Sequence, residues 1–395
     1  MKSLLSFLLV STIAAAIAVE TGCSQAAESR QTAPIVTPPS LDDGWATGSL
    51  EQAGIDRRRI EAMTQSIHAH PEYNLHALLI EHDGRLVYEE YFSGKDERWG
   101  NPLGDVTFTR ETKHDLRSVT KSVVSALLGI ANRAGTIPSL DAPLLDFFPE
   151  LKELQVPERR AITIRHALMM ASGLQWHEDV PYNDPTNDEI VMTRSADPMG
   201  YVLSRPVAAS PGTVWRYNGG TTQVLGTIVQ RATKQRLDEY ARAVLFSPLG
   251  IEDVEWLGNL AGVPSAASGL RLRPRDLAKF GSLYLHEGKW NGRQVIPADW
   301  VKESTQRRLT LPGQKVTGYG YQWWHACYPT PAGIVQVPTA VGNGMQRIFV
   351  LQDQRTVVTA LSGLYNQFRL NPPERLLLDF ILPALPSSSG SPCPS

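Results

Sequence analysis

Ser118 and Lys121 form the only S-x-x-K in the chain. Residues three apart share one face of a helix, so the Lys121 amine can reach the Ser118 hydroxyl. A serine hydroxyl is a weak nucleophile until a neighbouring base accepts its proton. The pair therefore predicts acyl transfer by a serine that an amine activates. The same spacing also fits an N-cap serine followed by a solvated lysine, so the motif needs support from the rest of the chain.

An apolar helical pattern begins directly after Ser118 and ends before Gly135. Ser118 is therefore expected at the N-terminus of a helix, where unpaired backbone N–H groups and the helix dipole favour negative charge. Such charge develops on the substrate during acyl transfer. The apolar face consists of Val119, Val123, Leu127 and Ile130.

Two further segments carry residues that could complete a site. Tyr217 stands in a Gly-rich turn before a helix predicted over 222–233, and its hydroxyl could relay a proton if nearby cations lower its pKa. Gly342 and Gly344 precede a strand predicted over 348–351, and glycines let strand N–H groups approach an oxyanion closely. Taken alone, these segments also fit a packed loop tyrosine and a plain hairpin turn.

Length, composition and charge bound the class of protein. With 395 residues, 42% hydrophobic and 20% charged, the chain is long enough for two interleaved subdomains with an ample core. The net charge of −2 and the lack of a dense basic run argue against nucleic acid as a partner. The nine histidines show no metal-ligand spacing, so neither a metal nor a cofactor is expected.

The N-terminal residues indicate a targeting signal. Lys2 precedes an apolar stretch over 4–19, which is short for a membrane span, and small residues follow it. Residues 1–23 are therefore predicted to be a secretory signal, which implies a periplasmic or extracellular protein. Cys23 also fits lipid attachment and membrane anchoring, although Glu20 occupies a position that is normally aliphatic in lipoprotein signals. Simple export and a membrane-anchored lipoprotein both remain open, and residues 24–41 form a predicted tether.

Cys327 and Cys393 are the other two cysteines of the chain. In an oxidising compartment they could pair and fix a flexible tail predicted over 386–395, but two free thiols fit as well. Neither cysteine has neighbours that indicate catalysis.

Strand patterns occur near both ends of the chain, and helical patterns fill the middle. One hairpin is predicted from 77–81 and 85–92, and another from 347–351 and 356–361. These patterns predict an α+β fold in which an antiparallel sheet from both termini is flanked by terminal helices. The domain would span 42–385, with a mostly helical subdomain over about 120–245. A cleft between the sheet and this subdomain would be the natural site. The predicted helices are 118–134, 164–170, 199–203, 222–233, 237–246 and 373–382.

The order of the three motifs resembles that of the serine β-lactamase and penicillin-binding superfamily. The similarity covers most of the mature chain and is greatest with the class C-like branch, which includes carboxylesterases, D-amino-acid peptidases and 6-aminohexanoate-dimer hydrolases. The resemblance implies an exported serine hydrolase that cleaves an ester or amide of a small molecule through an acyl-enzyme. Other family-like phrases are 114–122, 162–166, 172–174, 269–272 and 290–292.

Carried over by position, the resemblance assigns roles to individual residues. Ser118 would be the acylated nucleophile, and Lys121 and Tyr217 would share the base role. The oxyanion hole would consist of the Ser118 N–H and a strand N–H, that of Gln346, with Gly344 beside it. Which of Lys121 and Tyr217 takes the first proton stays open, because the two groups are expected to titrate as a coupled pair.

Two positions depart from the family's motifs. The second motif is commonly Tyr-x-Asn, but Gly219 stands at the asparagine position and Asn218 comes one residue earlier. Asn218 could supply the substrate hydrogen bond or be a turn residue. Asn343 replaces the lysine or histidine that holds a substrate carboxylate, and Arg347 could restore the charge or point to solvent.

These departures leave three functions to compare. An esterase or amidase fits best, because such relatives tolerate the loss of the cation at Asn343. A β-lactamase or D-amino-acid peptidase is the second interpretation. A non-catalytic binding protein of the same fold is the third, although it has no chemical reason to retain all three catalytic residues. Four tryptophans could line an apolar acyl pocket or lie in the core: Trp176, Trp215, Trp323 and Trp324.

Overall fold

The computed structural model describes residues 35–259, 262–311, 317–330 and 333–386. The predicted signal, Cys23, most of the predicted tether, Cys393 and the tail from residue 387 lie outside the described residues. The last residues of the predicted tether contact the folded unit, because Arg275 donates a hydrogen bond to the Pro39 carbonyl at 3.0 Å.

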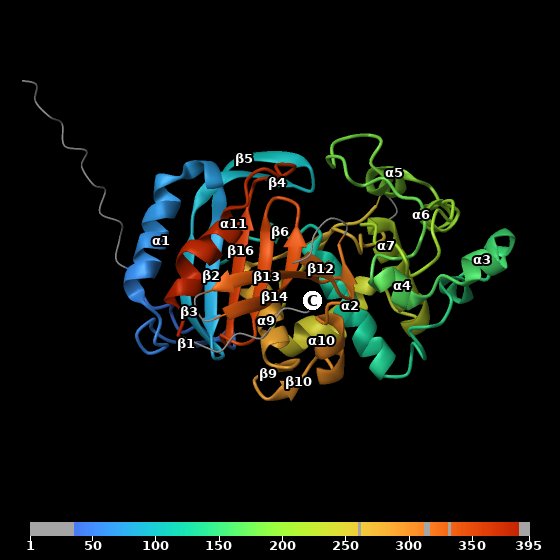
Figure 1. Ribbon diagram of the computed structural model, residues 1–395. Helices are drawn as coiled ribbons and strands as arrows, with labels where there is room; N and C mark the ends of the chain where they lie inside the picture. The colour runs from blue at the N-terminus through green and yellow to red at the C-terminus, as the bar shows by residue number, and fades with distance from the viewer. Residues whose placement is uncertain (1–34, 260–261, 312–316, 331–332, 387–395) are drawn as a thin grey trace, which may run out of the picture. The chain divides into compact units, whose positions relative to one another are not determined.

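Among the described residues, a nine-stranded sheet forms the centre of the fold (Figure 1). Two N-terminal strands lie beside a C-terminal one, so both ends of the chain build one sheet, as predicted. Neighbouring strands run antiparallel except β1 and β3, which are parallel. The order across the sheet is β1 (Ala46–Thr47), β3 (Arg85–Tyr91), β2 (Leu75–His82), β16 (Thr356–Ser362), β15 (Gln346–Leu351), β14 (Gly333–Gly342), β13 (Trp324–Thr330), β12 (Thr317–Tyr319) and β11 (Leu309–Thr310).

Two tight hairpins set this order, and both were predicted. The turn between β2 and β3 has Asp83 (φ 52°) and Gly84 (φ 77°) in the left-handed region, the type I′ geometry that matches the twist of paired strands. Strands β15 and β16 pair from Arg347 to Leu351, with a short connection between them. Both predicted hairpins are confirmed, with β2, β15 and β16 slightly longer than predicted and β3 one residue shorter.

Helices bury both faces of the sheet. Along β2, Leu78 and Ile80 pack into one core while Ala77 and Leu79 pack into the other, the two-residue alternation of a strand. The first core also holds α1 (Arg57–Ala69) and a closing helix made of α11 (Pro372–Leu376), a π-helical segment (Leu377–Ile381) and α12 (Leu382–Ala384). The second holds α2 (Val119–Arg133), α9 (Pro274–Leu285) and α10 (Ala298–Ser304).

The middle of the chain is mostly helical, as predicted. The predicted helices correspond to α4 (Ile164–Leu168), α6 (Pro198–Leu203), α7 (Gly219–Thr233) and α8 (Leu237–Ala241), which a π-helical segment (Arg242–Phe246) continues. Two short helices were not predicted, α3 (Pro157–Arg160) and α5 (Asp188–Arg194). The start signal of α5 was present in the sequence, because the Asn187 side chain caps the Glu189 N–H at 2.9 Å.

Short strands outside the main sheet guide the chain toward Ser118. The Leu116 N–H donates to the Leu270 carbonyl at 3.0 Å, so the chain enters α2 directly from a paired strand. These strands are β4 (Ser93–Arg98) with β5 (Asn101–Thr107), β6 (His114–Asp115) with β8 (Leu270–Leu272) and β7 (Glu255–Trp256), and β9 (Lys289–Trp290) with β10 (Arg293–Gln294).

Two further observations concern the predicted export and tail. Cys327 is disulfide-bonded, and its partner lies outside the described residues. Within the described part of the chain, none of the helices has the length and apolarity that a membrane span requires.

Candidate active site

Ser118 occupies the N-cap position of α2, and only 8% of its surface is exposed. Unlike an ordinary N-cap serine, it makes no side-chain bond to the helix backbone. Its Oγ accepts a hydrogen bond from Lys121 Nζ at 3.0 Å instead. Among the described residues, the Ser118 N–H has no acceptor. The hydroxyl is therefore held by an amine, and the N–H is open for a substrate oxygen.

Lys121 is almost fully buried and is surrounded by oxygen atoms. Its Nζ donates to Ser118 Oγ, to the Ala267 carbonyl at 2.9 Å and to Glu189 Oε2 at 3.3 Å. An ammonium has three donors and no acceptor, so this arrangement suits the charged form. Burial favours the neutral amine, but the charges of Glu189, Tyr217 and Glu178 outweigh it and raise the pKa of Lys121.

Tyr217 lies just before α7 and completes the cluster. It lines one cavity together with Ser118. The Lys121 Nζ lies 5.0 Å from the centre of the tyrosine ring. Burial raises the pKa of Tyr217, and the Lys121 charge opposes this shift. The structure thus brings together the three residues that were selected from two distant segments of the sequence.

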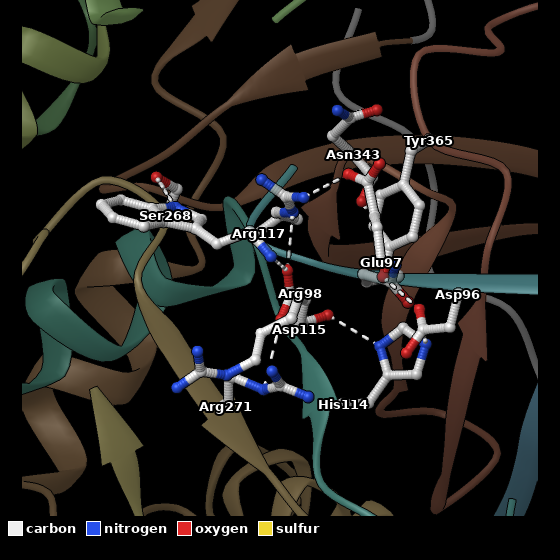
Figure 2. Close-up of polar contacts among 12 residues, drawn as sticks. Asp96, Glu97, Arg98, His114, Asp115, Arg117, Ser268, Arg271, Asn343 and Tyr365 are labelled. Carbon is white, nitrogen blue, oxygen red and sulfur yellow. Dashed lines mark hydrogen bonds and ion pairs between the residues drawn. The ribbon is translucent and has the colours of Figure 1, made fainter. Parts of the chain in front are cut away.

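Arg117, directly before Ser118, has a left-handed φ of 48°. Residues other than glycine adopt this conformation at a cost, so its surroundings must hold it in place. Its guanidinium pairs with Glu97 and, at 3.2 Å, with Asp115, and lies 5.0 Å from the Tyr365 ring centre (Figure 2). This network fixes the direction in which the chain presents Ser118.

Two cavities, each of about 350 Å³, meet at Ser118. A substrate can therefore place chemically different groups on the two sides of the reacting bond. The first cavity is lined by many polar side chains, among them Glu97, Arg117, Asn183, Glu189 and Asn366. The second is lined mainly by apolar and aromatic side chains, among them Val180, Tyr217, Trp324, Val341, Met345 and Phe368.

The Gly-rich segment 342–345 connects the two cavities. Asn343 lines both of them, and its side chain donates to Asn366 Oδ1 at 3.1 Å and accepts from the Asn366 N–H at 2.8 Å. Gly344 has a φ of 92°, and a Cβ there would lie 2.7 Å from the Tyr365 ring. Glycine is therefore required at this position.

Gln346, the predicted oxyanion donor, lines neither cavity and is fully buried. Its side chain binds Ser362, donating to the carbonyl at 2.8 Å and accepting from the N–H at 3.0 Å. Val341 is better placed, because it lines the second cavity beside Ser118. The pairing of β13 with β14 ends at Thr339, so among the described residues the edge of β14 at Val341 is not covered by β13.

Asn218 does not face a cavity, contrary to the idea that it binds substrate. It is the N-cap of α7, and its Oδ1 accepts the Thr221 N–H at 2.9 Å. Only 1% of its surface is exposed, and its Nδ2 has no partner among the described residues. The structure therefore supports the alternative in which Asn218 is a turn residue.

Two buried acidic residues that sequence analysis did not single out surround Gly219. Glu178 Oε2 accepts hydrogen bonds from the Gly219 N–H and from Trp176 Nε1, both at 2.6 Å. Its Oε1 accepts from the Tyr182 hydroxyl at 2.7 Å. The second acidic residue, Glu189, comes from the unpredicted helix α5.

Glu189 and Glu178 are hydrogen-bonded to each other and share one proton near neutral pH. Burial, followed by the charge of Glu189, raises the pKa of Glu178 to about 7. Burial also disfavours the ionised form of Glu189, but Lys121 and the hydrogen bonds from Glu178 and Ser268 hold its pKa below the ordinary value. The Ser268 hydroxyl donates to Glu189 Oε1 at 2.9 Å. The ionised member of the pair is thus the one that contacts Lys121.

The four tryptophans divide between core and cavity. Trp176 and Trp323 are buried in the second core, and Trp324 lines the apolar cavity. Trp215 stacks near Tyr217, with ring centres 6.3 Å apart. The idea of an apolar pocket holds for Trp324, and the core interpretation holds for Trp176 and Trp323.

Arg347 does not point to solvent, and it does not simply restore the missing cation. It is 9% exposed, and its guanidinium donates to the carbonyls of Gly342 (3.3 Å) and Gln346 (2.9 Å). Burial lowers the pKa of Arg347 to about 10. The side chain forms one wall of the second cavity while it supports the Gly-rich segment from behind.

One group of described residues has the donor types of a metal site: His76, Asp96 and His114. Local spacing does not reveal this group, because His76 and His114 are far apart in the chain. His76 Nδ1 lies 2.8 Å from His114 Nε2, and the Tyr365 hydroxyl donates to Asp96 at 2.9 Å. Through these hydrogen bonds the group supports β6, the strand that leads into Ser118. Figure 2 shows His114 and Asp96 of this group.

Comparison with known proteins agrees with this geometry. The β-lactamase family profile matches residues 67–384. Esterase EstB of Burkholderia gladioli is 28% identical over 228 residues, which are 55% of this chain and 55% of that protein. The chain thus spans about half the length of this relative.

A second relative and a solved structure extend the comparison. The 6-aminohexanoate-dimer hydrolase of Paenarthrobacter ureafaciens is 26% identical over 275 residues, which are 65% of this chain and 67% of that protein. A class C β-lactamase structure superimposes with a TM-score of 0.64 at 13% identity, covering 84% of this chain and 97% of that one. At this level of identity the structural likeness shows the fold.

Proposed function

The chain belongs to the β-lactamase family, and we propose that it is a serine hydrolase which cleaves an ester or amide bond of a small molecule through an acyl-enzyme at Ser118. One observation carries the proposal. The Ser118 hydroxyl accepts a hydrogen bond from the buried Lys121 amine at the point where two cavities meet, and Tyr217 lines one of these cavities beside it. An activated nucleophile at such a junction is the arrangement that acyl transfer needs.

Acylation forms a bond between Ser118 Oγ and the carbonyl carbon and breaks the bond to the leaving group. As Ser118 Oγ attacks, its proton passes to the Tyr217 oxygen and the Tyr217 proton passes to the leaving oxygen or nitrogen, while charged Lys121 stabilises the negative charge that develops between them. A water molecule then attacks the acyl carbonyl carbon. Its proton passes through the Tyr217 hydroxyl to Ser118 Oγ as the bond between Ser118 and the acyl group breaks. The Ser118 N–H and the Val341 N–H on the uncovered edge of β14 are proposed to hold the oxyanion, in place of Gln346.

Cavity composition favours an ester or amide without a carboxylate beside the reacting bond. Asn343 stands where relatives that bind carboxylates carry a cation, and its amide is occupied by Asn366. Arg347 is bound to backbone carbonyls. The named activities of esterase EstB and the 6-aminohexanoate-dimer hydrolase point in the same direction. These features count against the β-lactamase and D-amino-acid peptidase alternatives.

Intact-protein mass spectrometry tests the proposal. The chain would be exposed to a fluorophosphonate, to p-nitrophenyl esters and to a penicillin, with Ser118→Ala as the control. We expect a fluorophosphonate adduct that depends on Ser118, rapid ester turnover and little reaction with penicillin. A folded wild-type protein that forms no adduct with any probe would favour the non-catalytic binding protein.

Export also belongs to the proposal. A disulfide at Cys327 fits an oxidising compartment, and the N-terminal sequence has the pattern of a secretory signal. The mass of the mature N-terminus from cell fractions would distinguish plain cleavage from lipid attachment at Cys23. A cytosolic protein that retains Met1 would contradict export.

A further inference from the structure

Gly219 stands at the position where the family's second motif commonly has asparagine. The space that a side chain at this position would occupy is filled by other residues. A Cβ at Gly219 would lie 2.1 Å from Glu189 Oε2 and 3.1 Å from Glu178 Oε2. Gly219 has no positive φ, so its backbone would accept a side chain. The carboxylate of Glu189 is therefore what excludes one.

The oxygen that fills this space is the same one that contacts the lysine of the first motif. Glu189 Oε2 lies 3.3 Å from Lys121 Nζ, and Lys121 Nζ lies 3.0 Å from Ser118 Oγ. An asparagine at position 219 would begin from almost the same point and could offer its amide oxygen to Lys121. Glu189 on α5 thus supplies an acceptor for Lys121 from the space that a side chain at position 219 would enter.

Several contacts hold Glu189 in this position and in its ionised form. Its N–H is capped by Asn187 at 2.9 Å, and Ser268 and protonated Glu178 bind the carboxylate. Burial leaves the carboxylate poorly screened by solvent, so its charge acts strongly on its neighbour. No such charge is available from an asparagine amide.

We propose that Glu189 is a positioning residue that occupies the space of the motif asparagine and holds Lys121 against Ser118. The inference rests on the proposed function, because it assigns Glu189 a task only if Ser118 is the nucleophile. The titratable and charged groups that face Lys121 are Glu189 on α5, Glu178 on the preceding loop and Tyr217 before α7. Of these, Glu189 has the largest effect on Lys121.

Exchange of the two positions is the sharpest test. Glu189→Ala should slow Ser118 labelling by a fluorophosphonate by about a hundredfold, because Lys121 loses its anchor. Gly219→Asn alone should be at least as damaging, since the new side chain and Glu189 need the same space. The double variant Glu189→Ala/Gly219→Asn should recover about tenfold or more over Glu189→Ala, because an amide oxygen again reaches Lys121.

The pH dependence of labelling shows whether Glu189 acts on Lys121 through its charge or only by packing beside it. In Glu189→Gln and in the double variant, Lys121 lacks its anionic partner, so the high-pH limb of the labelling rate should move to lower pH by about 1–3 units. A loss of packing alone would slow labelling without moving this limb. Glu81→Gln is the matched control, because Glu81 is equally buried but binds Ser282 and His286.

Thermal melting of each variant identifies any variant that fails to fold. If Gly219→Asn alone does not fold, the double variant still tests the inference. A double variant no more reactive than Glu189→Ala, or a Glu189→Gln profile that coincides with the wild type, would overturn the inference. If Ser118-dependent labelling of the wild type persists in either case, the proposed function stands. A wild-type protein that is not labelled at all contradicts the proposed function itself.

Discussion

Helices α2 and α7 begin in similar surroundings, yet their N-cap residues do different work. Each helix has 15 residues, and each starts with a buried polar residue, Ser118 or Asn218. Asn218 bonds the Thr221 N–H in the usual way, whereas Ser118 bonds Lys121 and leaves its own N–H without an acceptor in the described part of the chain. One helix start is committed to stability, and the other keeps its polar groups available for chemistry.

The largest difference between the two helix starts should appear on removal of Ser118. Ser118→Ala is expected to abolish ester turnover and fluorophosphonate labelling, while the free energy of unfolding changes by less than about 1 kcal/mol, because no capping bond is lost. Mass spectrometry and urea unfolding measure the two effects. Full turnover in this variant would refute the nucleophile, and a large loss of stability would mean that Ser118 serves as an ordinary cap.

Substitution of Lys121 tests whether the reactivity of Ser118, at the start of α2, depends on the Lys121 amine. Lys121→Met keeps most of the buried volume but removes the donor to Ser118, so labelling should slow by about a thousandfold. Stopped-flow or timed labelling at several pH values measures the loss. A decrease of less than tenfold would mean that Tyr217 accepts the Ser118 proton without help from the Lys121 charge.

Glu178 tests the electrostatics at the start of α7, where it accepts the Gly219 N–H. Its pKa is about 7 in the folded chain, above the ordinary value of 4.5. The folded state thus binds the extra proton, and the contribution of Glu178 to stability falls as pH rises from about 4.5 to above 7.

Glu178→Gln cannot ionise and should remove this pH dependence. The stability of this variant relative to wild type should therefore increase by about 3 kcal/mol between pH 4.5 and pH 8. Urea unfolding of both proteins at the two pH values measures the difference, in which groups that do not interact with Glu178 cancel. A constant difference would show that folding does not raise the pKa of Glu178.

Asn218 gives the smallest expected effect and completes the comparison. Asn218→Ala should lower the free energy of unfolding by about 1 kcal/mol through loss of the cap, and Asn218→Ser should restore most of it. Ester turnover in Asn218→Ser should stay within about threefold of wild type, because a serine preserves the cap. A selective loss of turnover in a fully stable Asn218→Ser would return Asn218 to the substrate site.

Local sequence signals predicted much of the fold. Asp83-Gly84 determines its hairpin through two left-handed residues, and the start of α2 follows from the apolar spacing after Ser118. The α5 helix was missed because its apolar residues, Ile190, Val191 and Met192, are consecutive and show no helical spacing. Its N-cap, Asn187, was a usable signal that a longer pattern would have reinforced.

Contacts in the candidate site could be predicted only between residues that are close in the sequence. Lys121 is one turn from Ser118, but its contact with Glu189 joins residues 68 positions apart, which no local pattern encodes. The choice between strand N–H groups for the oxyanion, Gln346 or Val341, also depends on contacts that local pattern does not encode. Strand pattern alone does not reveal that β13 stops pairing at Thr339 and leaves the edge at Val341 uncovered by β13.

The shared volume at Gly219 also constrains how such a site can change during evolution. Because a Cβ at position 219 would lie 2.1 Å from Glu189 Oε2, asparagine at 219 and glutamate at 189 compete for one space, and the carboxylate must move if both are present. We therefore expect the identities of these two positions to depend on each other among relatives, with glutamate at 189 found together with glycine at 219.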